Sequence, residues 1–215
     1  MLYRHVCIES LGYELPSNIV TTLSLEERLA PVYERLSLSF GRLEMMTGIH
    51  ERRFWDKEIP PSKTSAIAAE KAITNSKLDK KEIECLLHTS LSRDFPRPAT
   101  ASFVYDSVGL PPSTTVFDIS NACLGFINGL VVLANMIELG QVKAGIVVAS
   151  ESSRQITETT IEEILNDPNM TRAKLKSSLA SLTLGSGAVA AILVHSSLSK
   201  CGHRLIGGIT RNASR

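Results

Sequence analysis

The chain has 215 residues, of which 43% are hydrophobic and 21% are charged, and its formal net charge is +1. This length and composition suit a globular protein with a substantial buried core, in one large domain or two small ones. A charge near zero without a long basic run argues against nucleic acid as the main partner, and no stretch reaches the ~20 apolar residues of a membrane-spanning helix.

The first predicted element is a β-rich segment over residues 5–15. Ser24 and Glu27 form a capping-box pattern, which predicts that a helix begins there. Pro31 is expected to kink or restart this helix. The apolar residues of the helix share one face, and they are Leu25, Leu29, Val32 and Leu36.

The middle of the chain alternates between helix and strand. An alanine-rich helix is predicted over 62–75 and a buried strand over 83–91. Thr100 is expected to cap a helix that ends at Gly109, and the next strand is predicted over 114–120.

The last predicted elements are a helix over 124–140, a buried strand over 144–152, a helical stretch over 157–182 and a strand over 187–196. Strands that are apolar on both faces and alternate with helices predict an α/β fold, with a mostly parallel sheet covered by helices. The 124–140 helix is apolar on nearly all sides, which predicts a layered fold with a second sheet on its far side.

The cysteines are widely spaced, with no pattern suited to zinc, and they are Cys7, Cys85, Cys123 and Cys201. The first ten residues carry charges where a secretion signal needs an apolar stretch. We therefore expect reduced thiols in the cytoplasm, with no metal site and no permanently bound cofactor.

Cys123 lies where a predicted strand passes into a helix, in the segment FDISNACLGFINGL. A cysteine taken at random from such a chain is usually packed as a small hydrophobe. At a helix N-terminus, however, backbone N–H groups and the helix dipole stabilise a thiolate, lower the thiol pKa and can bind an oxyanion. The pattern alone leaves both interpretations open. Cys7, Cys85 and Cys201 lack these features and are expected to be structural.

Four segments, in order, resemble the thiolase superfamily and in particular its ketoacyl synthase III-type condensing enzymes. They are 46–55 with a Thr-Gly-Ile-x-x-Arg pattern, the cysteine segment 117–130, the strand at 145–152, and the glycine-containing turn and strand at 184–196. Residues 89–102, together with NACLGFING and the long helical stretch, resemble more closely the head-to-head condensing thiolase of the bacterial olefin pathway, the OleA type.

The resemblance implies that Cys123 is a nucleophile that is acylated by a fatty acyl thioester. A second acyl thioester would be condensed onto it in a Claisen reaction that gives a β-keto product. The resemblance also implies a homodimer that acts in fatty acid biosynthesis or lipid metabolism.

By the same resemblance, residues 1–202 form the N-terminal half of a two-half thiolase fold, and 203–215 begin the second half, the rest of which is absent from this chain. The catalytic histidine and asparagine of the family belong to that second half. The chain's own histidines match no catalytic position, and they include His50, His88, His195 and His203.

Two departures from the family pattern affect the expected chemistry. The OleA subgroup has a glutamate, thought to act as a base, where this chain has Arg97, and an arginine cannot act as a general base. Ketoacyl synthase III proteins hold coenzyme A with a tryptophan and an arginine where this chain has Arg42 and Met46. The resemblance therefore leaves open whether coenzyme A or a carrier protein bears the acyl group.

The leading hypothesis is an acyltransferase that forms an acyl-Cys123 enzyme and carries out Claisen condensation. One alternative is decarboxylative condensation of the 3-oxoacyl-carrier-protein synthase III type. Others are a non-catalytic subunit that keeps the fold for dimerisation, or a piece of a longer enzyme. The expected partners are acyl thioesters, a second copy of the chain, and a separate chain that supplies the C-terminal half.

Overall fold

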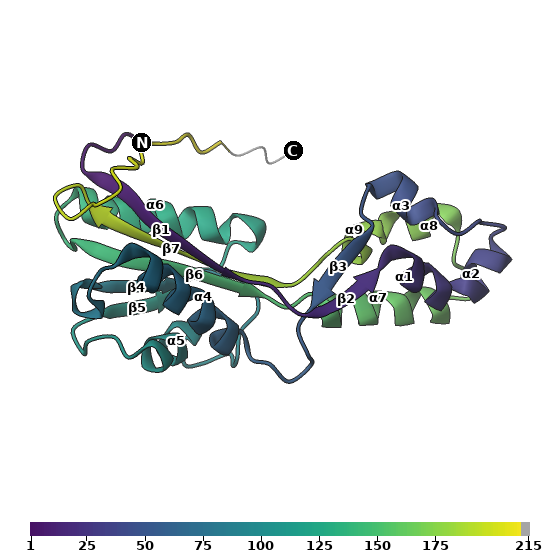
Figure 1. Ribbon diagram of the computed structural model, residues 1–215. Helices are drawn as coiled ribbons and strands as arrows, with labels where there is room; N and C mark the ends of the chain where they lie inside the picture. Colours follow the sequence, from purple (N-terminus) through teal and green to yellow (C-terminus); the bar gives the residue numbers. More distant parts are fainter. Residues whose placement is uncertain (212–215) are drawn as a thin grey trace. The chain divides into compact units, whose positions relative to one another are not determined.

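The chain forms two units in the computed structural model, which describes residues 1–211 (Figure 1). Unit 1 comprises Met1–Glu14, Pro60–Ser150 and the chain from Ala188 onward. Unit 2 comprises Leu15–Ile59 and Glu151–Gly187. Among the described residues, no helix combines the length and the apolar character needed to cross a membrane.

Unit 1 is built on a five-stranded sheet with the strand order β1-β7-β6-β4-β5. Strand β4 pairs in parallel with β5 and with β6, while β1 and β7 are antiparallel. The predicted α/β class with a mostly parallel sheet is confirmed. The strands are β1 (Val6–Glu14), β4 (Cys85–His88), β5 (Thr115–Asp118), β6 (Ala144–Glu151) and β7 (Gly187–His195).

Helices cover both faces of this sheet (Figure 1). Helix α6 (Gly125–Glu138) packs on one face, and its Leu133 and Ile137 form a core with Cys85 and Leu87 of β4. Helices α4 (Pro61–Ser76) and α5 (Thr100–Val108) lie on the other face, and the short 3₁₀ turn η1 (Lys80–Glu82) precedes β4.

Because of a β-bulge at Glu9, strand β1 packs against the helices on both faces of the sheet. The pairing of β1 with β7 shifts register between Ile8 and Ser10, so one extra residue exchanges the two faces of the strand. Val6, before the bulge, joins the core under α6. Gly12, after it, lies against α4, where an added Cβ would be 2.3 Å from the carbonyl oxygen of Ala68.

Unit 2 contains a two-stranded antiparallel sheet of β2 (Asn18–Thr21) and β3 (Glu51–Phe54), which the sequence did not predict. Its helices enclose an apolar core that includes Leu25, Leu29 and Ile161. They are α1 (Thr22–Arg28), α2 (Ala30–Arg35), α3 (Arg42–Thr47), α7 (Arg154–Asn166), α8 (Arg172–Ser177) and α9 (Leu179–Leu182).

Two predicted helix caps are wrong. Helix α1 is capped by Thr21, whose hydroxyl accepts from the Ser24 N–H, so Ser24 lies inside the first turn. Thr100 is the first residue of α5, and the Asp118 carboxylate accepts from the backbone N–H groups of Thr100 and Ala101 at 2.9 Å each. The predicted restart at Pro31 is confirmed, because α2 begins beside it.

The segment predicted to begin a second half has little regular structure within the described residues. It forms isolated bridges from Arg204 to Cys7 and from Gly207 to Leu2. Residues 212–215 of that predicted segment lie outside the described residues.

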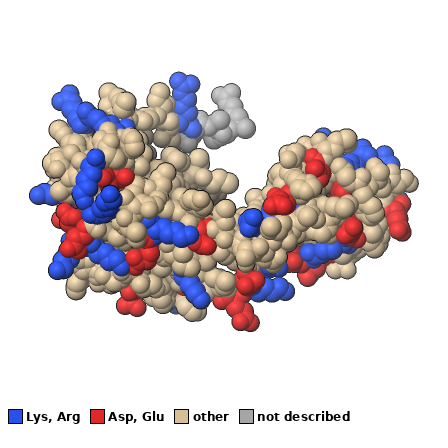
Figure 2. Space-filling view, in the orientation of Figure 1, with Lys and Arg blue, Asp and Glu red and all other residues tan. Residues whose placement is uncertain are grey.

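The surface charges are mixed. Figure 2 shows Lys and Arg side chains among Asp and Glu on the face drawn there.

Helix α6 approaches the sheet closely through two glycines. A Cβ added at Gly125 would lie 2.3 Å from the carbonyl oxygen of Thr89. A Cβ added at Gly129 would lie 2.6 Å from Cγ2 of Thr89 and 2.8 Å from Cγ1 of Val147. Because real Cβ atoms need more room, the helix can take this position only with glycine at both places.

The two glycines should respond differently to relief at Thr89. We expect Gly125→Ala and Gly129→Ala each to lower the free energy of unfolding by about 1–3 kcal/mol through overpacking. Adding Thr89→Ser removes Cγ2 and should recover part of the loss for Gly129→Ala, but none for Gly125→Ala, whose obstacle is a backbone oxygen. Urea denaturation of the single and double variants measures this, and equal recovery in both would contradict it.

Unit 2 holds a fully buried carboxylate, Glu26 on α1. It accepts hydrogen bonds from the Tyr33 hydroxyl at 3.1 Å, the Gly41 N–H at 2.5 Å and the Leu43 N–H at 2.7 Å. Burial, and then the charge of Glu26, raise the pKa of Tyr33 well above its usual value. This carboxylate therefore joins α1, α2 and the start of α3.

Removing the Glu26 carboxylate should destabilise the fold, because two buried donors, the Tyr33 hydroxyl and the Leu43 N–H, and the part-buried Gly41 N–H lose their acceptor. We expect Glu26→Ala to lower the free energy of unfolding by about 3 kcal/mol. Glu26→Gln keeps one acceptor oxygen and should lose clearly less. Urea unfolding at neutral pH compares the two variants, and equal losses would show that packing rather than hydrogen bonding dominates at this site.

Candidate active site

Cys123 is exposed and lies in the turn between β5 and α6. The 3₁₀ turn η2 (Ala122–Leu124) carries it and leads directly into the helix. Ala122 has φ +44°, in the left-handed region that residues with a side chain rarely adopt. The Leu124 N–H donates to the Asn121 carbonyl at 3.0 Å and closes the turn. The predicted position at a strand-to-helix junction is confirmed.

This geometry presents a thiol at the positive end of a helix. Negative charge on the sulfur, or on a carbonyl oxygen bound beside it, would be stabilised by the N-terminal N–H groups of α6. A strained backbone such as that of Ala122 persists only where its surroundings enforce it, and such residues cluster at functional sites. The arrangement suits nucleophilic attack on an acyl group.

The other cysteines have different surroundings. Cys7 and Cys85 are buried in strands, and burial raises the pKa of Cys85 to about 11, which makes its thiol a poor nucleophile. Cys201 is exposed in a turn, where its Sγ lies 3.4 Å from a carboxylate oxygen of Glu9. The placement of Cys7 and Cys85 in the interior agrees with their predicted structural role.

The histidines are distributed over different environments. His88 is fully buried at the end of β4, with Nδ1 3.9 Å from Asp118. His50 is exposed in unit 2 and lies 3.2 Å from Glu44. His195 stacks on His5, with ring centroids 5.2 Å apart. Among the described residues, no group of three or more His, Cys, Asp or Glu side chains could hold a metal ion.

Arg97 is exposed on the loop between β4 and α5. A carboxylate anchors this loop on each side. The Asp94 side chain accepts from the Ser62 N–H at 2.9 Å, and Asp118 binds the N–H groups that follow the loop at Thr100. The part of the loop that carries Arg97 is thus tied to unit 1 at Asp94 before it and at Thr100 after it.

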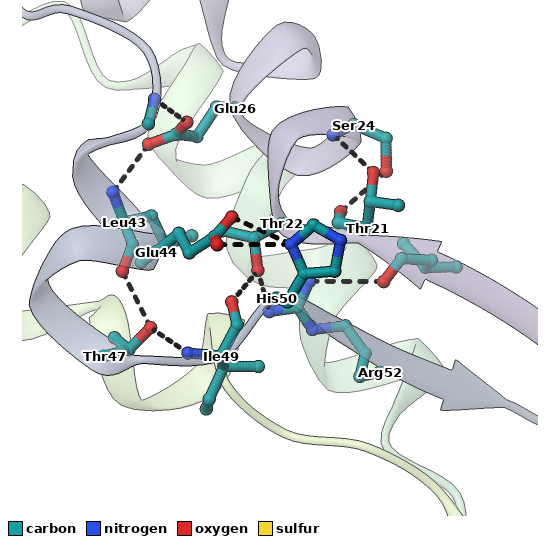
Figure 3. Close-up of polar contacts among 12 residues, drawn as sticks. Thr21, Thr22, Ser24, Glu26, Leu43, Glu44, Thr47, Ile49, His50 and Arg52 are labelled. Atoms are coloured by element: carbon teal, nitrogen blue, oxygen red, sulfur yellow. Dashed lines mark hydrogen bonds and ion pairs between the residues drawn. The ribbon is translucent and has the colours of Figure 1, made fainter.

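The Thr-Gly-Ile-x-x-Arg segment has a scaffolding role in unit 2 (Figure 3). Gly48 has φ +68° and ends helix α3. The Ile49 carbonyl accepts from the Thr22 hydroxyl at 2.5 Å, and the same hydroxyl accepts from the buried Arg52 guanidinium at 2.8 Å. These contacts hold the turn between α3 and β3 against the start of α1.

Arg42 and Met46 both line a pocket of about 270 Å³ in unit 2. Arg172 and Lys176 of α8 add further cationic groups, and the apolar lining includes Leu38, Leu43, Leu175 and Leu179. The Arg172 guanidinium donates to the carbonyl of Leu36 at 2.7 Å, so it also ties α8 to the end of α2. The sequence singled out Arg42 and Met46 only as departures from the family's coenzyme A contacts. It did not indicate the cations of α8, whose signal is their spacing of one helical turn.

Known proteins match the chain along most of its length. The 3-oxoacyl-[acyl-carrier-protein] synthase III family matches residues 117–208. The acyl-CoA:acyl-CoA alkyltransferase of Shewanella oneidensis is 44% identical over 210 residues, which are 96% of this chain and 60% of that protein. The enzyme of the same name from Xanthomonas campestris is 36% identical over 214 residues and is covered to 63%.

Solved structures match the fold. The cerulenin-bound crystal structure of OleA from Xanthomonas campestris superposes with a TM-score of 0.93 at 37% identity, covering 99% of this chain and 65% of that one. A beta-ketoacyl-[acyl-carrier-protein] synthase III from Koribacter versatilis is 30% identical over 157 residues. The chain spans about 60% of the length of the alkyltransferases that it matches. In sequence and fold, the chain therefore matches the N-terminal half of thiolase-superfamily condensing enzymes of the ketoacyl synthase III-like, OleA type.

Proposed function

We propose that Cys123 is the nucleophile of an acyltransferase that joins two fatty acyl thioesters by Claisen condensation. The observation that carries the proposal is the exposed thiol on a strained turn at the start of α6. The 44% identity to an acyl-CoA:acyl-CoA alkyltransferase supports this choice of reaction.

The proposed chemistry has two steps. Cys123 Sγ attacks the thioester carbonyl, the new C–S bond forms, and the carrier leaves as a thiol with the proton. A second acyl thioester then gives its α-proton to a base, and its carbanion attacks the acyl-Cys123 carbonyl. The acyl–sulfur bond breaks, and the departing Cys123 thiolate takes up a proton, which restores the free thiol. The N–H groups at the start of α6 are positioned for the charge that develops near the sulfur.

The alternative is decarboxylative condensation, as in 3-oxoacyl-carrier-protein synthase III. The family match over residues 117–208 and the relative from Koribacter versatilis support it. Loss of carbon dioxide creates the carbanion without a carboxylate base, which is compatible with the exposed cation Arg97. Release of carbon dioxide during turnover would separate this reaction from the Claisen route.

The proposal includes an assembly. Residues 1–202 serve as the N-terminal thiolase-like half and 203–215 begin the second, supplied by the same or a separate chain. The exposed apolar residues Leu124, in η2 just before α6, and Ile127, on α6, support a covering partner. We further propose that the chain acts as a homodimer in fatty acid or lipid metabolism. We propose the cytoplasm as its location, because a reducing compartment keeps the Cys123 thiol free.

Acylation of Cys123 is the first test. Incubation with tetradecanoyl-CoA should add one acyl group to the wild-type protein and to Cys201→Ala, but none to Cys123→Ala. Cys201 is the matched control, because it is also an exposed cysteine of unit 1. Intact-mass spectrometry measures the adduct, and its absence from a folded wild-type protein would refute the assignment.

We further propose that the unit 2 pocket binds the phosphate-bearing part of the acyl carrier, since Arg42 and Lys176 line an otherwise largely apolar pocket. Arg42→Glu should raise the Kd for coenzyme A about tenfold, the loss expected for one charge-assisted contact. Lys57→Glu, an exposed cation of unit 2 that is not among the pocket residues, is the control. Isothermal titration measures both, and equal effects would contradict the pocket assignment.

A further inference from the structure

A hydrogen bond between two amide side chains spans the Cys123 turn. Asn121 Nδ2, just before the turn, donates to Asn128 Oδ1 on α6 at 2.5 Å. Side chains on a helix lean toward its N-terminus, which brings Asn128 back toward the segment that precedes the helix. The bond therefore links the segments on the two sides of Cys123.

The residue between these contacts is the strained one. Ala122 has φ +44°, and without outside restraint an alanine would leave the left-handed region. Asn121 is restrained through its backbone and through its side chain. Its backbone carbonyl accepts from the Leu124 N–H, and its side-chain amide donates to Asn128 Oδ1. Fixing Asn121 in this way restricts the backbone rotation by which Ala122 could relax.

Asn128 lies on the part of α6 that packs closely against the sheet. The neighbouring Gly129 and the earlier Gly125 lie against Thr89, where the helix has no room to shift toward the sheet. The hydrogen bond from Asn121 to Asn128 thus restrains the position of the Cys123 turn relative to the sheet.

We propose that Asn128 is a positioning residue that, through Asn121, keeps the Cys123 turn in the conformation needed for acyl transfer. This inference rests on the proposed function, since it assumes that Cys123 accepts the acyl group. Misplacing a reacting atom by about 1 Å can slow a reaction on the order of 100-fold. Loss of the Asn121–Asn128 hydrogen bond should therefore slow acylation more than it weakens the fold.

The experiment compares Asn128→Ala, Asn121→Ala and the double variant in the otherwise unchanged protein. Asn135→Ala is the matched control, because it removes another side-chain hydrogen bond of α6, to the Tyr3 hydroxyl at 2.9 Å. Amide hydrogen exchange of Leu124 reports on the turn without any acyl transfer. Single-turnover acylation by tetradecanoyl-CoA reports on the reaction, and thermal melting reports on the fold.

We expect Asn128→Ala to speed exchange at Leu124 about tenfold and to slow acylation about 10- to 100-fold, with a melting temperature close to that of Asn135→Ala. The double variant should lose no more than either single variant, since both remove the same contact. Unchanged exchange at Leu124, or unchanged acylation despite faster exchange, overturns the proposal. If the wild type is not acylated at all, the proposed function fails, whereas faster exchange at Leu124 still supports the hold of Asn128 on the turn.

Discussion

The contact of α6 with the sheet, made through Gly125 and Gly129, determines where the exposed Cys123 thiol lies. With no side chain at either position, the helix rests directly on Thr89 and Val147, and its first turn comes to the carboxyl end of β4. The turn from β5 must then cover a short distance to a fixed point. The left-handed Ala122 lies in that connection, which runs from Asp118 at the end of β5 to Gly125 at the start of α6.

Most helices and strands follow from periodicity, because burial of one face leaves a pattern in nearby residues. The alanine-rich helix, the buried strands β4 and β6, and the helix after Cys123 were all predictable on this ground. Their ends were less predictable. The start of α5 is capped by Asp118 of strand β5, which follows α5 in the chain. The residues around Thr100 therefore gave no sign of this carboxylate.

Some features of the candidate site were likewise evident from local sequence, and others were not. The place of Cys123 at a strand-to-helix junction was evident from local sequence, whereas the backbone of Ala122 was not, since alanine shows no preference for positive φ. The pairing of β2 with β3 and the pocket around Arg42 join segments far apart in the chain. Such long-range associations depend on the whole of unit 2. The local sequence around Arg172 and Lys176 therefore did not show that their side chains would line the same pocket as Arg42.

The two carboxylates that anchor the loop before α5 make that loop a replaceable module. Asp94 holds its beginning to α4, and Asp118 holds its end at the start of α5. The residues between them, from Phe95 to Ala99, are exposed or half-exposed and can diverge without moving the strand that leads to Cys123. A lineage could therefore exchange the tip, including Arg97, and alter the surface of this part of unit 1 while Cys123 stayed in place.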